Sequence, residues 1–299
     1  MLVLSVAVLC GGAVGGVIWY RSRPLSTAAM YRRMDPNDNV VFYIDFNTLR
    51  RSGILQRLMG SKDVEDADYR RFVEKIGFDY KEHLDSAMVE FANTGKFMLV
   101  RGQFDWRKLA AYAKEQRGSC YAMICRMPGS APERQISFFP VQNTVMALAV
   151  SPNDNAVHRL TDQPGGPDIE MPKEPIWLSI PGPVLRSGRN LPAGTRSFTR
   201  SIEHADRVVL TLNAEDGRYA AKMEIQCTTE GEATEVAGQL RQATATLRDL
   251  IARENLKPNP ADLSGVLASG EFRTEGVRAI GRWWIEDSFL DNVWSGGVN

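Results

Sequence analysis

The residues from Leu2 to Tyr20 carry no charge and are followed at once by Arg21 and Arg23. As a helix that rises about 1.5 Å per residue, this stretch is roughly 28 Å long, enough to cross the hydrocarbon core of a bilayer. The rest of the chain has an ordinary globular composition. The sequence therefore predicts a transmembrane helix or signal anchor over residues 1–23, followed by a folded body.

Two alternatives compete with a retained membrane helix. A cleavable signal peptide would use the Ser-Thr-Ala sequence at 26–28, but the apolar run is longer than usual and no basic residue precedes it. A lipoprotein signal at Cys10 would need small residues before it, and Val8 and Leu9 fit poorly. The length of the run favours the retained, single-pass helix.

The charges after the span bear on its orientation. Arg21, Arg23, Arg32 and Arg33 all follow it, and the positive-inside rule then places the body in the cytoplasm. If the true start lies upstream and supplies basic residues, the body is extracytoplasmic instead. The sequence leaves both topologies open.

Four glycines inside the predicted span form a small-residue pattern. Gly11 and Gly15 are four residues apart, and so are Gly12 and Gly16. This spacing lets two membrane helices approach closely, so it predicts helix packing and self-association. The alternative is that glycine is simply common in membrane helices.

Composition limits the class of partner. The chain is 43% hydrophobic and 24% charged, which is typical of a folded protein that buries a core. Lysine plus arginine equals aspartate plus glutamate at 36 each, so the sequence predicts no binding to nucleic acid through phosphate neutralisation.

Cysteine is sparse, with Cys10 in the anchor and three more in the body. Residues 119–127 are expected to form one strand, in which Cys120 and Cys125 lie about 16 Å apart on opposite faces and cannot bridge each other. We therefore expect both to be buried thiols. A bridge from Cys227 to either of them remains an open alternative.

The body divides near its middle. Residues 24–39 are polar and contain proline and asparagine, which predicts a stalk. Strand and helix patterns over 40–162 predict a first α+β unit. A dense run of proline and glycine over 163–174 predicts a linker, and residues 175–299 then form a second unit.

The predicted strands and helices follow the same order in the two units. IWLSIPGPVLRSG (176–188) matches FYIDFNTLRRSG (42–53), and the hairpin at 208–225 matches MVEFANTGKFMLV (88–100). A helix follows each hairpin, and Asp105 is expected to cap the first of these helices. This indicates an internal duplication.

The predicted fold class is α+β. It comprises two similar units of antiparallel sheet with helices on one side, ferredoxin-like in the broad sense, preceded by one transmembrane helix. Merging of the strands into one larger sheet is the alternative.

With its LRRSG ending and its hairpins that turn at glycine, a basic residue and an aromatic residue, this layout resembles uncharacterised bacterial proteins. Those proteins have an N-terminal membrane anchor and duplicated α+β units, and the resemblance covers most of the chain. It implies no activity and no functional residue.

Catalytic and metal-binding patterns do not stand out. His83, His158 and His204 each lack a second ligand at metal spacing, and no nucleophile elbow or phosphate loop occurs. We therefore expect no catalytic residue, no metal and no cofactor.

Three residues remain as functional candidates. Asp45 ends an otherwise apolar strand, where a buried carboxylate needs a partner, and the alternative is a capping acid. Trp283 and Trp284 are adjacent on the last strand, so their rings should point to opposite faces. One is expected in the core and the other exposed for contact with a protein or a lipid headgroup.

These observations predict a membrane-tethered, non-enzymatic binding or scaffold protein of unknown ligand. Its expected partners are the membrane through the N-terminal helix, a second copy through the same helix, and an unknown protein or lipid. One alternative is an enzyme with a site between the units, built on groups such as Asp45 or His158. The other is a carrier of an apolar ligand or lipid.

Overall fold

The computed structural model describes residues 25–58, 67–131, 133–161, 170–187, 202, 204–215 and 218–294. Its strands are β1 (Val40–Asp45), β2 (Leu84–Ala92), β3 (Gly95–Gly102), β4 (Ser119–Tyr121), β5 (Ile124–Pro128), β6 (Gln135–Gln142), β7 (Val145–Ser151), β8 (Ile176–Pro181), β9 (Arg207–Glu215), β10 (Arg218–Gln226), β11 (Glu271–Glu275) and β12 (Arg278–Ile285). Its helices are α2 (Thr27–Tyr31), α3 (Phe46–Arg51), α4 (Ile54–Leu58), α5 (Ala67–Ile76), α6 (Tyr80–His83), α7 (Trp106–Glu115), the 3-10 helix η2 (Ala156–Leu160), α8 (Gly182–Ser187), α10 (Glu230–Arg253), α11 (Leu263–Ala268) and α12 (Asp287–Trp294).

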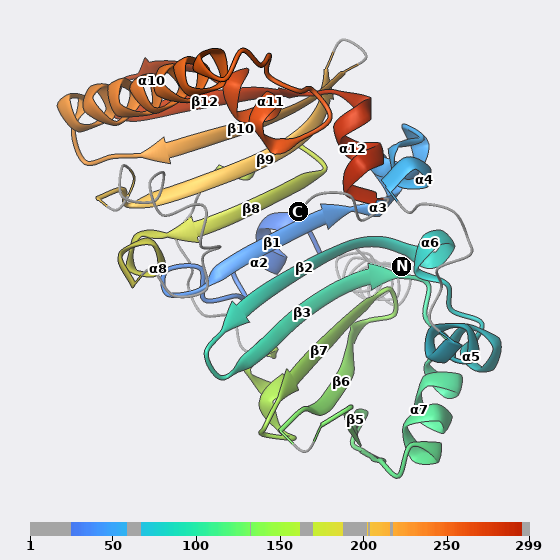
Figure 1. The fold of residues 1–299 in the computed structure, drawn as a ribbon. Helices are drawn as coiled ribbons and strands as arrows, with labels where there is room; N and C mark the ends of the chain where they lie inside the picture. Colours follow the sequence, from blue (N-terminus) through green and yellow to red (C-terminus); the bar gives the residue numbers. More distant parts are fainter. Residues whose placement is uncertain are drawn as a thin grey trace, which may run out of the picture.

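All these strands belong to one antiparallel sheet of 12 strands, in the order β11-β12-β10-β9-β8-β1-β2-β3-β7-β6-β5-β4 (Figure 1). The prediction of two separate sheets is therefore wrong. The halves join because β1 pairs with β8, from Val41 opposite Ser179 to Ile44 opposite Ile176. This pairing satisfies backbone groups that would otherwise lie at two open sheet edges.

Each half has the same strand order. The order β1-β2-β3-β7-β6 in the first half corresponds to β8-β9-β10-β12-β11 in the second. In each half a helix, α7 or α10, follows the central hairpin. The arrangement agrees with an internal repeat, while β4 and β5 extend the first half alone.

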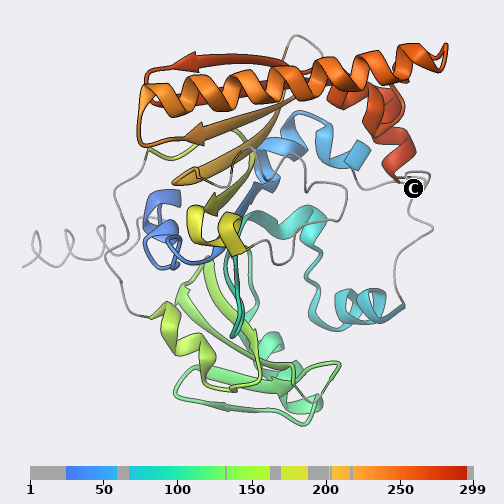
Figure 2. The same cartoon turned by 60° about the vertical axis from the view of Figure 1, so that its left-hand side comes forward.

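Helices cover both faces of the sheet, not one as predicted. Figure 2 shows α2 and η2 on one side of the strands and α5 and α12 on the other. We call the first side the α2 face. The second side also carries α10, which shares a core with α12, and we call it the α10 face.

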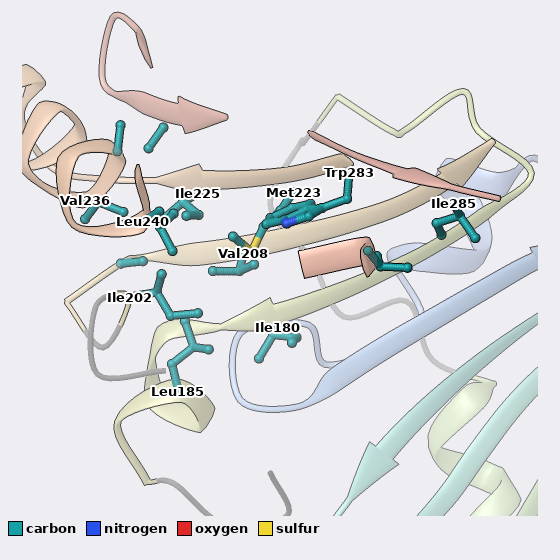
Figure 3. Packing of buried hydrophobic residues seen from close by; sticks show 14 of the residues in the cluster. Ile180, Leu185, Ile202, Val208, Met223, Ile225, Val236, Leu240, Trp283 and Ile285 are labelled. Carbon is teal, nitrogen blue, oxygen red and sulfur yellow. The ribbon is translucent and has the colours of Figure 1, made fainter. Parts of the chain in front are cut away.

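The α10 face carries two hydrophobic cores. In the first, Trp283, Ile225 and Val208 of the strands pack with Leu240 and Val236 of α10 (Figure 3). In the second, α5 and α7 cover strands β5 to β7. The α2 face carries the third core, beneath α2 and η2.

Residues 25–39, the described part of the predicted stalk, pack against the sheet. Met30, Tyr31 and Met34 are buried in the core of the α2 face. Arg207 of β9 holds this segment from the other half, donating to the Tyr31 hydroxyl at 2.9 Å and to the Pro36 carbonyl at 3.1 Å. The stalk prediction relied on the proline and asparagine of this segment and did not consider its three apolar side chains, which are buried.

The predicted membrane helix at 1–23, with Gly11, Gly12, Gly15 and Gly16, lies outside the described residues. Within the described residues, no helix is long and apolar enough to cross a membrane. The predicted fold is corrected accordingly, to one large sheet with helices on both faces and, among the described residues, no helix that could span a membrane.

Cys120 and Cys125 form a disulfide, contrary to the prediction. Residues 119–127 are not one strand, because the chain turns at Ala122 and Met123 and pairs β4 with β5. The two cysteines then lie directly opposite each other, with Cα atoms 4.0 Å apart. Cys227 is buried and free.

Differential alkylation should separate these three cysteines. In the native, unreduced protein we expect iodoacetamide to modify Cys227 roughly 100-fold more slowly than in urea, since the thiol must first be exposed. Burial also raises the pKa of the Cys227 thiol, with smaller contributions from Glu232 and Asp206, which keeps it protonated. Cys120 and Cys125 should react only after reduction. Peptide mass mapping reads out each site, and fast native labelling of Cys227 would contradict the structure.

Candidate functional site

The middle of the α10 face carries apolar side chains that no described core includes. On β1, Val41 and Tyr43 enter the core of the α2 face, while Val40 and Ile44 pack against the first core of the α10 face. Because side chains alternate along a strand, Phe42 also points to the α10 face.

The strand register identifies the neighbours of Phe42 on the α10 face. Phe42 lies opposite Val89 of β2, and Val89 lies opposite Met98 of β3. Phe91 and Val100 occupy the neighbouring rows on the same face. We call these five residues, Phe42, Val89, Phe91, Met98 and Val100, the central patch.

The central patch separates the two cores of the α10 face. Its residues belong to none of the three hydrophobic cores in the described part of the chain. All five are partly exposed or exposed, and Phe91 retains 44% of its surface. Figure 1 shows β1, β2 and β3 face-on between α10 and the α5–α7 pair.

One charge lies beside the central patch. Lys96 is directly opposite Phe91, and its Nζ lies 5.9 Å from the ring centroid. This distance permits a weak cation–π contact at an exposed site. The patch is thus apolar, with a positive charge at one end.

The exposure of Phe91 predicts a small effect on stability. Phe91→Ala should lower the free energy of unfolding by only about 1 kcal/mol, because the ring is 44% exposed in the folded protein. Phe97→Ala is the matched control, since Phe97 lies on the next strand but is buried on the α2 face. Urea denaturation should show a clearly larger loss for Phe97→Ala. Equal losses would mean that Phe91 is covered.

Asp45 caps a helix. Its carboxylate accepts hydrogen bonds from the Thr48 backbone N–H at 2.8 Å and from the Thr48 hydroxyl at 3.0 Å, at the start of α3. The carboxylate therefore finds its partner three residues along the chain, in Thr48. The structure places Asp45 at the end of β1, outside the central patch.

The two tryptophans lie on opposite faces, as their adjacency predicts. Trp283 is buried in the first core of the α10 face. Trp284 is partly exposed on the α2 face, where the guanidinium carbons of Arg218 and Arg282 each lie 4.0 Å from its ring centroid. The arginines therefore cover the ring of the more exposed tryptophan.

A polar pocket of about 780 Å³ lies between residues 170–174 and strands β9, β10 and β12. Three of its charged groups pair with one another: Arg278 donates to Glu224 at 2.9 Å, and Lys222 lies 3.8 Å from the same carboxylate. The hydrogen bond with Glu224 raises the pKa of Arg278, which stays charged.

The enzyme hypothesis predicted converging titratable groups near this linker. Of the described residues, neither Asp45 nor His158 lines the polar pocket. In the described ranges, moreover, no group of three His, Cys, Asp or Glu side chains is arranged to hold a metal ion. The structure does not bring the sequence candidates together.

Glu90 is the residue that sequence reasoning missed. It is 0% exposed and accepts hydrogen bonds from the Asp35 backbone N–H at 2.9 Å and the Asn39 side chain at 2.8 Å. It also pairs with Arg159 of η2, whose guanidinium lies 3.7 Å from the Phe97 ring centroid. An acid within the apolar run MVEFA was a usable signal, but all these contacts are internal and structural.

No protein-family model and no curated protein matches the sequence. Solved structures of a protein named TP0453 are similar in fold. Crystal form IV is 13% identical with a TM-score of 0.48, covering 89% of this chain and 96% of that one. Crystal form III is 11% identical with a TM-score of 0.49, covering 89% of this chain and 97% of that one. Crystal form I is 11% identical with a TM-score of 0.47, covering 92% of this chain and 99% of that one.

Proposed function

We propose that this chain is a non-enzymatic binding protein, and that its central patch receives an amphipathic helix of a protein partner. The observation that carries the proposal is the partly exposed apolar stretch between two helix-covered parts of one sheet face. Apolar surface of this kind, bordered by polar residues, is typical of interaction sites.

The size of the open stretch favours a helix. Strands lie about 4.8 Å apart, so β1 and β3 are separated by roughly 10 Å. A helix with its side chains is about 10–12 Å across, and one helix therefore fits over three strands. Helices already cover this face on both sides, so a bound helix would complete the layer.

The flanking helices argue against two other occupants. A second copy would have to bring its own sheet past the helices on both sides of the patch, and a flat lipid surface would meet those helices first. A single helix reaches the strands between them. Lys96 favours an acidic side chain on the rim of the bound helix.

Site-specific photo-crosslinking tests the proposal. A benzophenone amino acid replaces Phe91 in the full-length protein, expressed in the cells that naturally produce it. The control position is Arg273, which is exposed on β11 and, by register, on the α2 face. We expect one discrete protein adduct from position 91, with the crosslinked peptide on the apolar side of an amphipathic helix.

A second change makes the result specific. Met98→Asp introduces a charge into the central patch and should abolish the adduct from position 91. The proposal fails if position 91 yields no adduct or a lipid adduct, or if Arg273 captures the same protein. It also fails if the crosslinked peptide is not helical in its own protein.

A further inference from the structure

The hairpin formed by β4 and β5 exposes two large apolar side chains at its tip. Tyr121 is 81% exposed and Met123 is 70% exposed, more than any other large hydrophobic residue in the described part of the chain. The hairpin lies at one end of the sheet, away from the central patch. Its tip is therefore a second, separate surface.

The backbone at the tip has an uncommon conformation. Ala122 and Met123 have φ angles of +48° and +71°, in the left-handed region that favours glycine. A two-residue turn with both φ angles positive matches the twist of a hairpin, but alanine and methionine adopt it at a cost. The disulfide between Cys120 and Cys125 encloses this turn.

These features keep the two side chains directed outward. In a longer or more relaxed loop, Met123 could fold back onto the sheet. Here Ile124, the next residue, packs against the core of the α2 face and fixes the base of the turn. A strained turn that presents apolar side chains to solvent suggests a binding role.

The segment that forms α7 and the hairpin is basic, although the chain as a whole is neutral. Helix α7 packs on the hairpin, with the Cys120 Sγ atom 3.8 Å from the Ala110 carbonyl oxygen. Residues 105–126 contain five cations and two acids, a net charge of +3. The cations are Arg107, Lys108, Lys114, Arg117 and Arg126, and the acids are Asp105 and Glu115.

We propose that this tip inserts Tyr121 and Met123 into the interfacial layer of a bilayer with anionic headgroups. A tyrosine suits this layer because its ring is apolar and its hydroxyl can stay hydrated. The net positive charge of residues 105–126 attracts anionic lipid. A protruding tip needs no complementary pocket on a soft lipid surface, and for that reason we favour lipid over a protein partner.

A local probe tests this inference in the full-length protein. An environment-sensitive fluorescent amino acid replaces Tyr121, and in a matched control it replaces Leu256, which is 60% exposed elsewhere. Each protein is titrated with vesicles of equal parts phosphatidylcholine and phosphatidylglycerol, with and without nitroxide-labelled lipid. The signal reports only the labelled position, so binding by another part of the chain does not mimic it.

We expect a blue shift and nitroxide quenching at position 121 and neither at position 256. Adding Met123→Ser should weaken the response at 121 by about tenfold in apparent affinity, because an apolar anchor is lost. The inference is overturned by no response at 121, by an equal response at 256, or by an equal response with phosphatidylcholine alone. A shift caused by a vesicle-free protein extract and not by vesicles would instead assign the tip to a protein partner.

The inference does not depend on the proposed function of the central patch. Met123→Ser leaves the patch intact and should not change photo-crosslinking from position 91. Conversely, Met98→Asp should leave the fluorescence response of position 121 unchanged. Failure of one proposal is therefore distinguishable from failure of the other.

Discussion

Glu90→Ala is expected to lower the free energy of unfolding by about 3–5 kcal/mol, the range found when one partner of a buried ion pair is removed. Glu90 is 0% exposed, so its charge is stable only through its contacts. The substitution leaves the Arg159 guanidinium without its carboxylate. It also removes the acceptor for the Asp35 amide and the Asn39 side chain. Urea denaturation followed by circular dichroism measures the loss.

Glu224→Ala is the matched control for this prediction. Glu224 lies on the same face of the sheet and also pairs with an arginine, Arg278 at 2.9 Å, but its side chain is 30% exposed. Exposed pairs contribute about 1 kcal/mol or less, so the control should be nearly neutral. Similar losses for the two variants would show that water reaches Glu90 in solution.

The role of Glu90 illustrates what the sequence could not provide. Its partners lie 51 to 69 residues away along the chain, in the segment that follows α2 and in η2. Local patterns do not reveal such contacts. Without them, the segment of residues 25–39 appeared polar and unattached, although three of its side chains enter a core.

Local features were predicted well. The turn between MVEFA and KFMLV falls between β2 and β3, where Gly95 has a positive φ of +147°. Asp105 caps α7, accepting from the backbone N–H groups of Arg107 and Lys108. Both features depend on residues within four positions, where side-chain chemistry and backbone geometry are directly linked.

Two features were predicted wrongly because no sequence pattern marks them. The Ala122–Met123 turn uses positive φ angles without glycine or asparagine, so nothing marked a hairpin and the disulfide was missed. The joining of the halves depends on pairing between β1 and β8, which are far apart in sequence. The sequence of neither half shows that its first strand pairs with another strand, because an edge strand and an inner strand can have the same sequence pattern.

The candidate site shows the same division. The β-rich, apolar run VVFYI predicted a strand, but it could not show which of its side chains would stay uncovered. The central patch became visible only when the helices were located, because exposure depends on what covers a strand. Asp45, by contrast, was chosen for its position and proved to act locally as a cap.

Trp177→Ala is expected to lower the free energy of unfolding by about 3–5 kcal/mol, as for other large buried aromatic residues. Trp177 is 1% exposed, and its ring stacks on Tyr43 with centroids 5.2 Å apart. Tyr31 meets it edge-on at 5.9 Å. Since Trp177 on β8 lies directly opposite Tyr43 on β1, its loss weakens the contact at the join between the two halves.

Two other substitutions test the cause of this loss. Trp284→Ala should cost about 1 kcal/mol, because that ring is only partly buried and is held by arginine contacts. Trp177→Phe should cost less than Trp177→Ala, since it keeps most of the ring. It also removes an indole N–H that is buried with no acceptor among the described residues. Calorimetry measures all three, and a Trp177→Ala variant as stable as Trp284→Ala would contradict the packing at the join. If the halves unfold together, the Trp177→Ala transition should remain single, because the continuous sheet links both halves through β1 and β8.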